Sequence, residues 1–499
     1  MSETIKYAGD YNLEICSIVS YQKDGKDKNN AKRLDIKGIV HLLHIYESLT
    51  SPAITGDITV IDARDIRTML PITGMERLEL KLSTPGTKKN GIIEYTEEVT
   101  EPLYIYKIEK IRPGGGTSRL QSYRLFFTSR EAYRNNICRV SKSFKGAVED
   151  GVLEILKDDR YLDSRKKFAV EETSTNHAIV IPNLKPFQAI QMLAKTAKSE
   201  LYENSGYLFY ETTEGFNFRS IESLLAVGGH TARPVVKKFQ YKAANMRTNE
   251  GARDILDELE QVMSYSFDNT VNMLENMNSG MAASRLITHD AFYKTITTTD
   301  YDYLDQYHNF FHTEHAKDGG KRDDNYMIPY AMFDKERKGL TEFPEMKTMV
   351  KTDTSKIHND YEQPNTKGNL QANISQKEQM MNGNLVLSVH GDTRIHVGEL
   401  INFELPYQVP VQGNDKQELN PYWAGRYLIM NLKHTIDMDT QKHSMTIKCA
   451  KDSTRISIPT ETEEMVVKLK EKNSNSIVNI YEADGNIQVT DNNAFIRGA

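Results

Sequence analysis

The sequence predicts a mainly β protein with α/β insertions, built from several domains. Its 499 residues are enough for about three to four domains of ordinary size. Residues 11–112 and 385–450 alternate apolar and polar side chains, which is the period of a strand with one buried and one exposed face. Between these stretches, several segments carry apolar residues at helical spacing. The alternation favours antiparallel sheets or barrels, and the helical segments favour insertions between them.

The composition is that of a globular protein that buries several cores. Hydrophobic residues make up 38% of the chain and charged residues 26%. The 63 Lys and Arg against 69 Asp and Glu give a formal net charge of −6. This excludes a strongly basic nucleic-acid binder. Mild acidity is compatible with a surface that nucleic acid passes without being captured.

The cysteines and the N-terminus bear on the compartment. The three cysteines are odd in number and far apart, so they form no disulfide framework and favour assembly in a reducing cytosol: Cys16, Cys138 and Cys449. Charged residues stand at Glu3, Lys6 and Asp10, where a signal peptide needs an apolar core. No apolar run approaches the roughly 20 residues that span a bilayer. We therefore expect a soluble protein with no membrane segment.

The clearest strand of the first stretch lies at residues 77–82. Leucines alternate there with charged residues in the order Arg77, Leu78, Glu79, Leu80, Lys81 and Leu82. Arg77, Glu79 and Lys81 share the polar face of this strand and are our candidates for an interface with another subunit. An ordinary solvated surface explains the same pattern.

The stretch ends at Pro113-Gly114-Gly115-Gly116, which has the composition of a domain boundary. A phosphate-binding loop is the functional alternative. No Lys-Ser/Thr pair follows the glycines, and the chain contains no G-x-G-x-x-G motif. A turn or hinge explains the segment better.

The middle of the chain mixes helical and strand signals. Residues 128–136 and 147–157 are predicted helices, and Pro186 opens another, since proline suits the first helical turn. Residues 207–218 are predicted to form a hairpin around a turn at 212–215. Residues 251–281 return to helical spacing, with Ile255, Leu259, Val262 and Met263. Residues 301–379 are polar, aromatic and loop-rich, and their pattern assigns no particular element to them.

Strand alternation returns after residue 385. It is seen at Leu385-Val386-Leu387, Ile395-His396-Val397, Ile401-Asn402-Phe403, Tyr427-Leu428-Ile429 and Met445-Thr446-Ile447. The last stretch, residues 468–499, has few apolar residues, and we expect it to order only against a partner. A role in anchoring a neighbouring component is the corresponding hypothesis.

The sharpest enzymatic candidate is a histidine cluster at His308, His312 and His315, with Glu314 beside it. On a helix, the i, i+4 spacing of the first two would put both imidazoles on one face, as a zinc site requires. The segment is not H-E-x-x-H, however, and Phe310 and Phe311 lie between the pair. A polar-aromatic loop or an interface patch explains it equally.

Other catalytic signatures are missing from the sequence. There is no G-x-S-x-G nucleophile motif, no ordered calcium loop and no carboxylate pair that spacing marks as acid and base. Cys138 beside Arg139 is better read as an incidental cysteine than as an activated thiolate. We therefore predict a protein that is not an enzyme and holds no cofactor.

Six motifs follow one another along the chain. They begin at Ser51 (SPAITGDITVID), Leu70 (LPITGMERLEL), Gly206 (GYLFYETTEGFNFRSIE), Asn278 (NSGMAASRLITHD), Gly391 (GDTRIHVGELI) and Ala424 (AGRYLI). In this order, they resemble the baseplate hub proteins of contractile-tailed bacteriophages. Glycines at 74 and 398 also precede similar alternating strands, a weak internal repeat. Residues 301–379 and the tail after 455 carry no matching motif.

This resemblance implies two tail-tube-like antiparallel β-barrel domains per chain. The implied division is 1–112 for the first barrel, 113–206 for a mixed α/β domain, 207–240 with 380–455 for a discontinuous second barrel, 241–379 for a helical and loop-rich insertion, and 456–499 for an extended tail. It also implies a homotrimer whose six barrels form a pseudo-six-fold ring between a hexameric tail tube and a trimeric central spike.

The resemblance further implies the partners and the location. The expected partners are the tail tube protein, the central spike protein, the tape measure protein and the surrounding baseplate proteins, with DNA passing through the lumen without specific binding. The expected location is the virion tail, assembled in the host bacterial cytoplasm. Two alternatives stay open: a spike-hub subunit of a phage-derived injection system, and a tail-associated metal-dependent hydrolase that uses His308, His312 and His315.

Overall fold

The structure is a computed structural model of the chain. It describes residues 5–21, 31–70, 72–86, 91–113, 120–174, 176–202, 204–227, 231–242, 255–269, 272–290, 293–314, 339–353, 366–381, 383–406, 419–455, 477–478 and 489–490. Most of the expected C-terminal tail, and with it the anchoring hypothesis, lies outside these residues. Within them, no helix is long and apolar enough to span a membrane.

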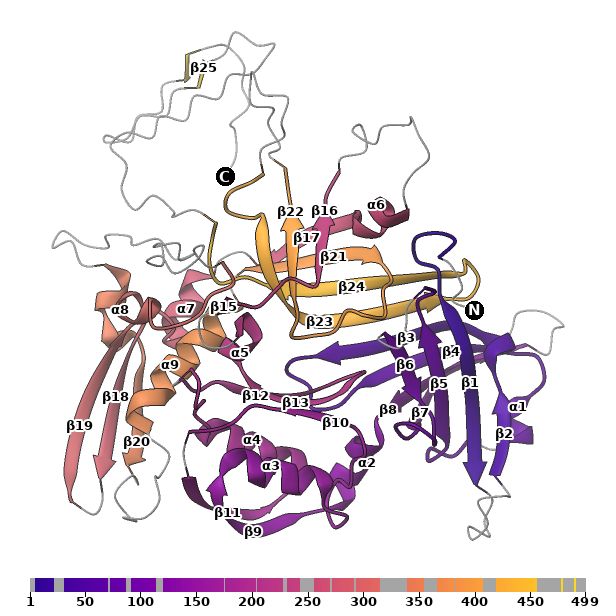
Figure 1. Ribbon diagram of the computed structural model, residues 1–499, viewed down its shortest axis with the longest axis horizontal. Coiled ribbons are helices and arrows are strands. Elements are labelled where there is room, and N and C mark those ends of the chain that lie inside the picture. Colours follow the sequence, from indigo (N-terminus) through magenta and orange to yellow (C-terminus); the bar gives the residue numbers. More distant parts are fainter. Residues whose placement is uncertain are drawn as a thin grey trace.

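One large sheet runs through both halves of the described chain (Figure 1). Its N-terminal strands are β1 (Asn12–Tyr21), β2 (Ala31–Asp35), β3 (Val40–Ser48), β4 (Thr55–Asp62), β5 (Arg77–Ser83), β6 (Ile92–Tyr95), β7 (Leu103–Pro113) and β8 (Gln121–Thr128). Its C-terminal strands are β16 (Lys237–Gln240), β17 (Val262–Asn269), β21 (Asn384–His390), β22 (Leu400–Glu404), β23 (Gly425–Asp437) and β24 (Lys442–Ala450). The main path is β17-β21-β24-β23-β3-β4-β8-β7-β5-β1-β2. The mainly β fold is therefore confirmed.

The N-terminal strands fold around one apolar core. Leu78, Leu80 and Leu82 of β5 are fully buried in it, as their alternation with charged residues predicts. Residues from β3, β4 and β8 close the core from the other side. The Pro-Gly segment at 113 does not separate two sheets, because β8 beyond it pairs with both β4 and β7. The hydrogen-bonded N-terminal part of the sheet therefore extends beyond Pro113 to Thr128.

The C-terminal strands close into a ring of their own. β16 pairs with β22, β22 with β23, and β17 with β21. An isolated bridge between Gln240 and Gln261 then connects the end of β16 to the start of β17. The core inside includes Leu387, Phe403 and Tyr427, all fully buried.

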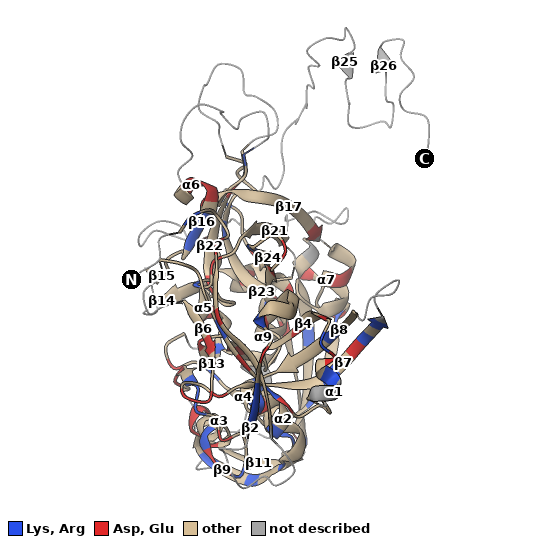
Figure 2. Ribbon diagram, turned by 90° about the vertical axis from the view of Figure 1, so that its right-hand side faces the viewer, with Lys and Arg blue, Asp and Glu red and all other residues tan. Residues whose placement is uncertain are grey.

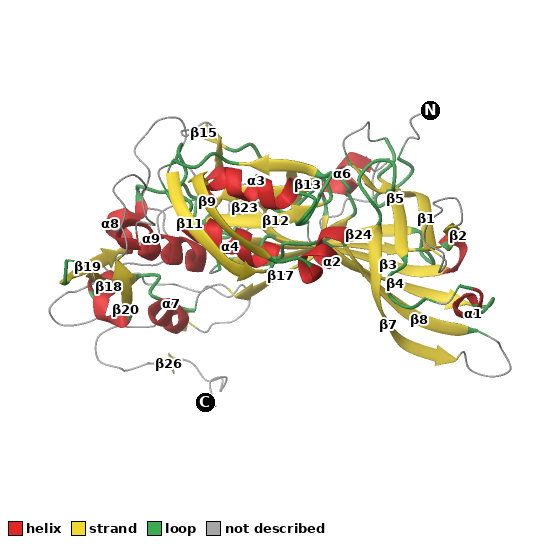
Figure 3. Ribbon diagram, turned by 90° about the horizontal axis from the view of Figure 1, so that it is seen from below, coloured by secondary structure: helices red, strands yellow, loops and turns green. Residues whose placement is uncertain are grey.

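A mixed α/β unit packs below the sheet in Figure 1. The helices α3 (Val148–Lys157) and α4 (Pro186–Thr196) lie between two antiparallel pairs of strands (Figure 3). One pair is β9 (Val140–Ala147) with β11 (Asn176–Leu184), and the other is β12 (Tyr207–Thr212) with β13 (Gly215–Ser220). The remaining elements are α2 (Arg130–Ile137), β10 (Lys167–Val170) and α5 (Ile221–Leu225). The helices and the hairpin expected here are present.

A smaller unit holds the rest of the middle region. The strands β18 (Ala283–Asp290), β19 (Thr295–Asp302) and β20 (Thr348–Asp353) form a three-stranded sheet. The helices α7 (Met273–Ser279), α8 (Tyr303–Tyr307) and α9 (Thr366–Gln379) complete the unit. Short elements elsewhere are β14 (Ala226–Val227), β15 (Thr231–Ala232), α1 (Ile66–Met69), α6 (Ile255–Glu260), β25 (Ile477–Val478) and β26 (Val489–Thr490).

Two expectations need correction. Residues 251–281 are not one helix: α6 ends at Glu260, and Val262 begins strand β17 of the large sheet. Residues 395–397 are not a strand but a turn segment, whose apolar members Ile395 and Val397 are buried in the second core. Residues 301–379, to which the sequence pattern assigns no particular element, contain α8, β20 and α9.

A buried ion triad joins the α/β unit to the large sheet. Lys166 Nζ lies 2.6 Å from Glu131 Oε2 and 2.5 Å from Glu211 Oε1, and all three side chains are at most 4% exposed. The other Glu211 oxygen accepts the backbone N–H of Ile54, before β4. Burial raises the pKa of Glu211. Burial also acts on Glu131, but Lys166 and Ser164 outweigh it and lower the pKa of that carboxyl.

Replacing the cation of this triad should destabilise the fold strongly. Lys166→Met leaves two buried carboxylates without a counter-ion, so we expect the free energy of unfolding in urea at pH 7 to fall by about 3–5 kcal/mol. The loss should shrink at acidic pH, because protonated carboxyls tolerate burial better. The control is Lys142→Met, whose partner Glu154 is half-exposed, with an expected loss below about 1 kcal/mol. Equal small losses in both variants would contradict the role of the triad.

Candidate functional surface

The large sheet has one continuous polar face. Across eight strands, directly paired residues form a row on the face away from both cores: Ser264, Ser388, Thr446, Lys433, Tyr46, Thr55, Thr128 and Tyr104. The adjacent row on the other face is buried: Val389, Met445, His434, Ile45, Gly56, Phe127 and Ile105. Both cores therefore lie on one side of this sheet. We call the opposite side the eight-strand face.

Hydroxyl groups and balanced charges dominate the eight-strand face. Five of the eight residues in the row above are Ser or Thr. Lys448 lies 3.9 Å from Asp268, and Lys107 pairs with Glu109 on β7. Lys433 Nζ stands 5.9 Å from the ring centre of Tyr46. The face is thus polar, but its cations have anionic or aromatic partners close by.

The strongest charge pair on this face is Asp57 with Arg124. The guanidinium donates from Nε and Nη2 to the two carboxylate oxygens at 2.7 and 2.6 Å. Tyr46 Oη donates to the same carboxylate at 3.0 Å, and His44 Nδ1 lies 3.0 Å from it. Burial would raise the pKa of Asp57, but the contacts with His44 and Arg124 hold it well below its usual range. These bonds tie β3, β4 and β8 together.

The two lateral edges of this eight-strand stretch differ in charge. At one end, β7 carries Lys107, Lys110 and Arg112 with Glu109 (Figure 2). At the other end, α6 carries Asp257, Glu258 and Glu260, and it leads directly into β17. In the described chain, β7 beyond Ile105 pairs only with β8, and β17 pairs along its length only with β21. Each edge therefore offers backbone groups for further pairing.

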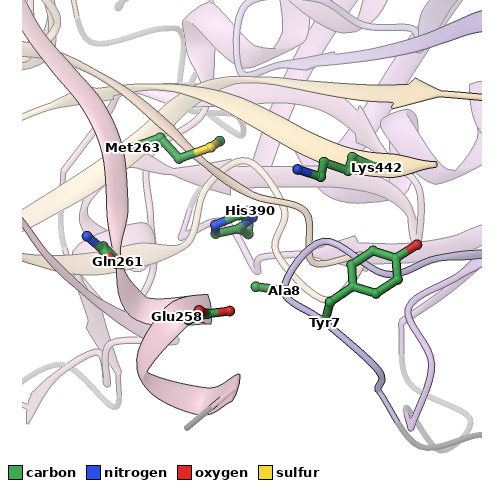
Figure 4. Close-up of a pocket in the computed structure, with 7 residues that line it drawn as sticks. All are labelled: Tyr7, Ala8, Glu258, Gln261, Met263, His390 and Lys442. Atoms are coloured by element: carbon green, nitrogen blue, oxygen red, sulfur yellow. The ribbon is translucent and has the colours of Figure 1, made fainter. Parts of the chain in front are cut away.

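A cavity of about 320 Å³ opens beside the β17 edge (Figure 4). Its apolar lining comes from Tyr7, Ala8 and Met263. Its polar lining includes Glu258, His390 and Lys442. It thus lies where the N-terminal segment, α6, β17, β21 and β24 come together.

The interface candidates from the sequence share one face of β5 but lie outside the eight-strand face. Glu79 is buried and lies 2.7 Å from Arg33. Lys81 Nζ lies 3.0 Å from Glu14 and 3.7 Å from Glu94. Arg77 lies 3.8 Å from Glu97. All three have partners within the chain, and their contact with another subunit stays a prediction.

The histidine cluster is split. His312 is buried, with Nδ1 2.9 Å from Asp452 and Nε2 2.9 Å from the carbonyl oxygen of Tyr307. Both ring nitrogens are therefore occupied by hydrogen-bond partners within the chain, which leaves neither of them directed at a metal site. His308 is the C-cap of α8, and its ring meets the Tyr307 ring edge-on at 5.6 Å between ring centres, whereas the His312 ring stacks on Tyr307 at 3.8 Å. His315 lies outside the described residues. No group of three His, Cys, Asp or Glu side chains suited to a metal occurs where the structure is described.

Comparison with known protein sequences finds a similar baseplate protein. No protein-family model matches the chain. A probable baseplate hub protein of Vibrio phage KVP40 is 21% identical over 414 residues, which are 80% of this chain and 86% of that protein. This similarity confirms the resemblance to baseplate hub proteins that the sequence motifs indicate.

Solved structures of tail proteins are also similar. The tail protein from Neisseria meningitidis MC58 is 9% identical, covers 89% of this chain and 97% of its own, and has a TM-score of 0.44. The 43 kDa tail protein of prophage MuSo2 from Shewanella oneidensis is 10% identical, covers 89% and 100%, and has a TM-score of 0.45. The E. coli c3393 protein, a component of the type VI secretion system, is 8% identical, covers 94% and 89%, and has a TM-score of 0.38.

Substitution of His312 in the buried His312–Asp452 pair distinguishes a structural role of this histidine from a role as a metal ligand. Burial would raise the pKa of Asp452, but His312 and Thr313 lower it to about 2. A lowered carboxyl pKa stabilises the fold above pH 4, and this contribution of about 2 kcal/mol is lost as the pH falls from 4 to 2. We expect His312→Gln to lower the free energy of unfolding at pH 7 by about 3 kcal/mol and to flatten its dependence on pH between 4 and 2. Stoichiometric zinc in the purified protein that disappears in His312→Gln would contradict the structural role.

Proposed function

We propose that this chain is a structural baseplate hub subunit of a phage contractile tail. The single observation that carries the proposal is the continuous eight-strand face, which has the cores of both halves behind it. A sheet of this kind forms the inner wall of a channel when its ends are joined. The sequence similarity to a probable baseplate hub protein supports the same conclusion.

The two ends of the sheet support a closed ring of identical copies. The β7 edge and the α6–β17 edge are different surfaces, so contact between them is head-to-tail and closes into a ring when the rotation allows it. Three copies, each with two sheet units, present six similar units. Such a trimer matches a hexameric tail tube on one side and a trimeric central spike on the other.

The chemistry of the eight-strand face suits a DNA channel. Phosphate binding requires cations that are free to replace the counter-ions of DNA. On this face, Arg124, Lys107 and Lys448 already have carboxylate partners. DNA and the tape measure protein would therefore slide along hydroxyl groups without electrostatic capture. The surrounding baseplate proteins contact the outer units, and the particle is assembled in the host bacterial cytoplasm.

The division into domains is part of this proposal. The first barrel is assigned to residues 1–112 and the mixed unit to 113–206, with β8 added to the first barrel for its pairing. The proposed second barrel takes 207–240 with 380–455, the insertion takes 241–379, and the tail takes 456–499. Two adjustments follow from the pairing: the hairpin β12–β13 packs in the mixed unit, and β17 joins the second barrel through β21.

Oligomeric state tests the proposal. By native mass spectrometry we expect a trimer, either alone or in the presence of the spike protein. Ile111→Glu places a charge on the β7 edge, where Ile111 is 47% exposed in the single chain, and should weaken the trimer about tenfold or more. The matched control is Ile137→Glu at the end of α2, which is 78% exposed and should leave the trimer intact.

A chain that stays monomeric with tube and spike proteins present would overturn the hub assignment. A trimer that Ile137→Glu weakens as much as Ile111→Glu would keep the hub but remove β7 from the subunit contact.

A further inference from the structure

A tight turn holds one apolar side chain out into solvent next to β7. The carboxylate of Glu76 accepts hydrogen bonds from the backbone N–H groups of Thr73, Gly74 and Met75 at 2.8–3.1 Å, and from the Thr73 hydroxyl at 3.0 Å. Burial would raise the pKa of Glu76, but these bonds outweigh it and lower it. Gly74 has a φ of +99°, which a residue with a side chain rarely adopts. The turn is therefore fixed before any partner arrives.

Met75 is the residue that this turn presents. It is 69% exposed, and Tyr106 of β7 is 45% exposed. Arg77 of β5 pairs with Tyr104 of β7, and extending this antiparallel register places Met75 opposite Tyr106. A backbone hydrogen bond of 2.9 Å from the Ile105 N–H to the Glu76 carbonyl oxygen supports this extension. A large apolar side chain on a rigid base is costly in water and suits a binding anchor, because little conformational entropy is lost on contact. We call Met75 and Tyr106 the knob.

The cavity beside β17 lies at the other lateral end of the same sheet (Figure 4). Met263, which is 41% exposed, together with Tyr7 and Ala8 gives it an apolar lining. Its volume of about 320 Å³ is enough for the side chain of a methionine. Methionine adapts well to irregular apolar spaces and contacts aromatic rings favourably.

Knob and cavity lie at the same level of the sheet. A second row of paired residues crosses seven strands from the knob to the cavity: Lys107, Phe126, Asp57, His44, Thr435, Ser444 and His390. Lys107 follows Tyr106 directly, and His390 lines the cavity. A copy that continues the sheet of its neighbour along these rows therefore brings its knob to the neighbour's cavity.

The charges beside the knob and beside the cavity are complementary. Lys110 and Arg112 follow the knob on β7. On the cavity side, α6 is acidic (Figure 2): Glu258 lines the cavity, and Asp257 and Glu260 lie on the same short helix. Opposite charge at the two ends favours head-to-tail contact and opposes pairing of two like ends.

We propose that the cavity beside β17 is the socket for Met75 of a second copy of this chain. In this contact the knob enters the socket, and the basic edge of β7 lies along acidic α6 of the neighbour. The inference rests on the proposed ring and names the residues that close it.

Cross-linking of two single variants tests the contact directly. Met75→Cys and Met263→Cys are prepared separately, each with Cys138→Ser, and are mixed and treated with a short bismaleimide. Because each chain carries one exposed thiol, a cross-linked dimer requires knob and socket to meet between two chains. We expect the mixture to give this dimer as the main product. Met75→Cys mixed with Val350→Cys, on exposed β20, should give none.

A charge exchange provides the second test. Lys110→Glu with Arg112→Glu should weaken the trimer about tenfold or more, as should Asp257→Lys with Glu260→Lys. All four changes in one chain should restore it, which misfolding cannot imitate. A trimer that gives no cross-link between positions 75 and 263, and whose stability the charge changes do not alter, would overturn the proposed socket contact. It would leave the hub assignment in place. A chain that forms no trimer under any condition would overturn the hub itself.

Discussion

The pairing of β23 with β3 is the constraint on which the rest of the structure depends. Seven consecutive residue pairs join strands that are separated by almost the whole chain. The two cores meet here, since Leu432 belongs to one and Ile436 to the other. Between them, His434 Nδ1 lies 3.0 Å from His443 Nε2, and burial lowers the pKa of His434 to about 4. Both rings are thus neutral near pH 7, and the junction holds no unpaired charge.

The junction also fixes the neighbouring units. Glu47 on β3 accepts the N–H of Thr213 from the β12–β13 turn and the N–H of Val397 from the second core, and His396 lies 3.5 Å from it. One buried carboxylate therefore connects three parts of the chain. On β4, Gly56 has no room for a side chain, because a Cβ atom would lie 2.2 Å from the Phe127 ring. Close approach of β3, β4 and β8 is what makes the polar face continuous.

Local pattern predicts the elements of this fold better than their assembly. Strict alternation in β5 and the apolar stripe of α3 are properties of neighbouring residues, and both appear in the structure. The segment after Glu260 misleads because Ile255, Leu259 and Val262 fit a helix, while pairing with β21 decides that Val262 begins a strand. That pairing joins residues more than 100 positions apart, which no local period reports. At Val262, pairing with a distant strand therefore overrides the helix that the local spacing of apolar residues indicates.

The candidate surface was harder to predict for the same reason. Thr446, Lys433 and Tyr46 look like ordinary solvated positions on three separate strands, and only the register of those strands makes them one row. The charged face of β5 shows the opposite case, because its pattern is conspicuous in the sequence but its side chains form ion pairs within the chain. The pairs are Arg77 with Glu97, Glu79 with Arg33, and Lys81 with Glu14. Charge pattern in one strand identifies its polar face but not what that face meets.

The unequal ends of the sheet fit the proposed ring of copies. A long sheet with two open edges would add copies without limit if the edges were alike and flat. Here one end is basic and carries Met75, and the other is acidic and carries a cavity. Like ends repel, so in the proposed ring each copy would accept one neighbour on each side, and the twist of the strands would turn successive copies about an axis. Closure of that ring would remove both edges from solvent and would thereby also protect the protein from open-ended aggregation.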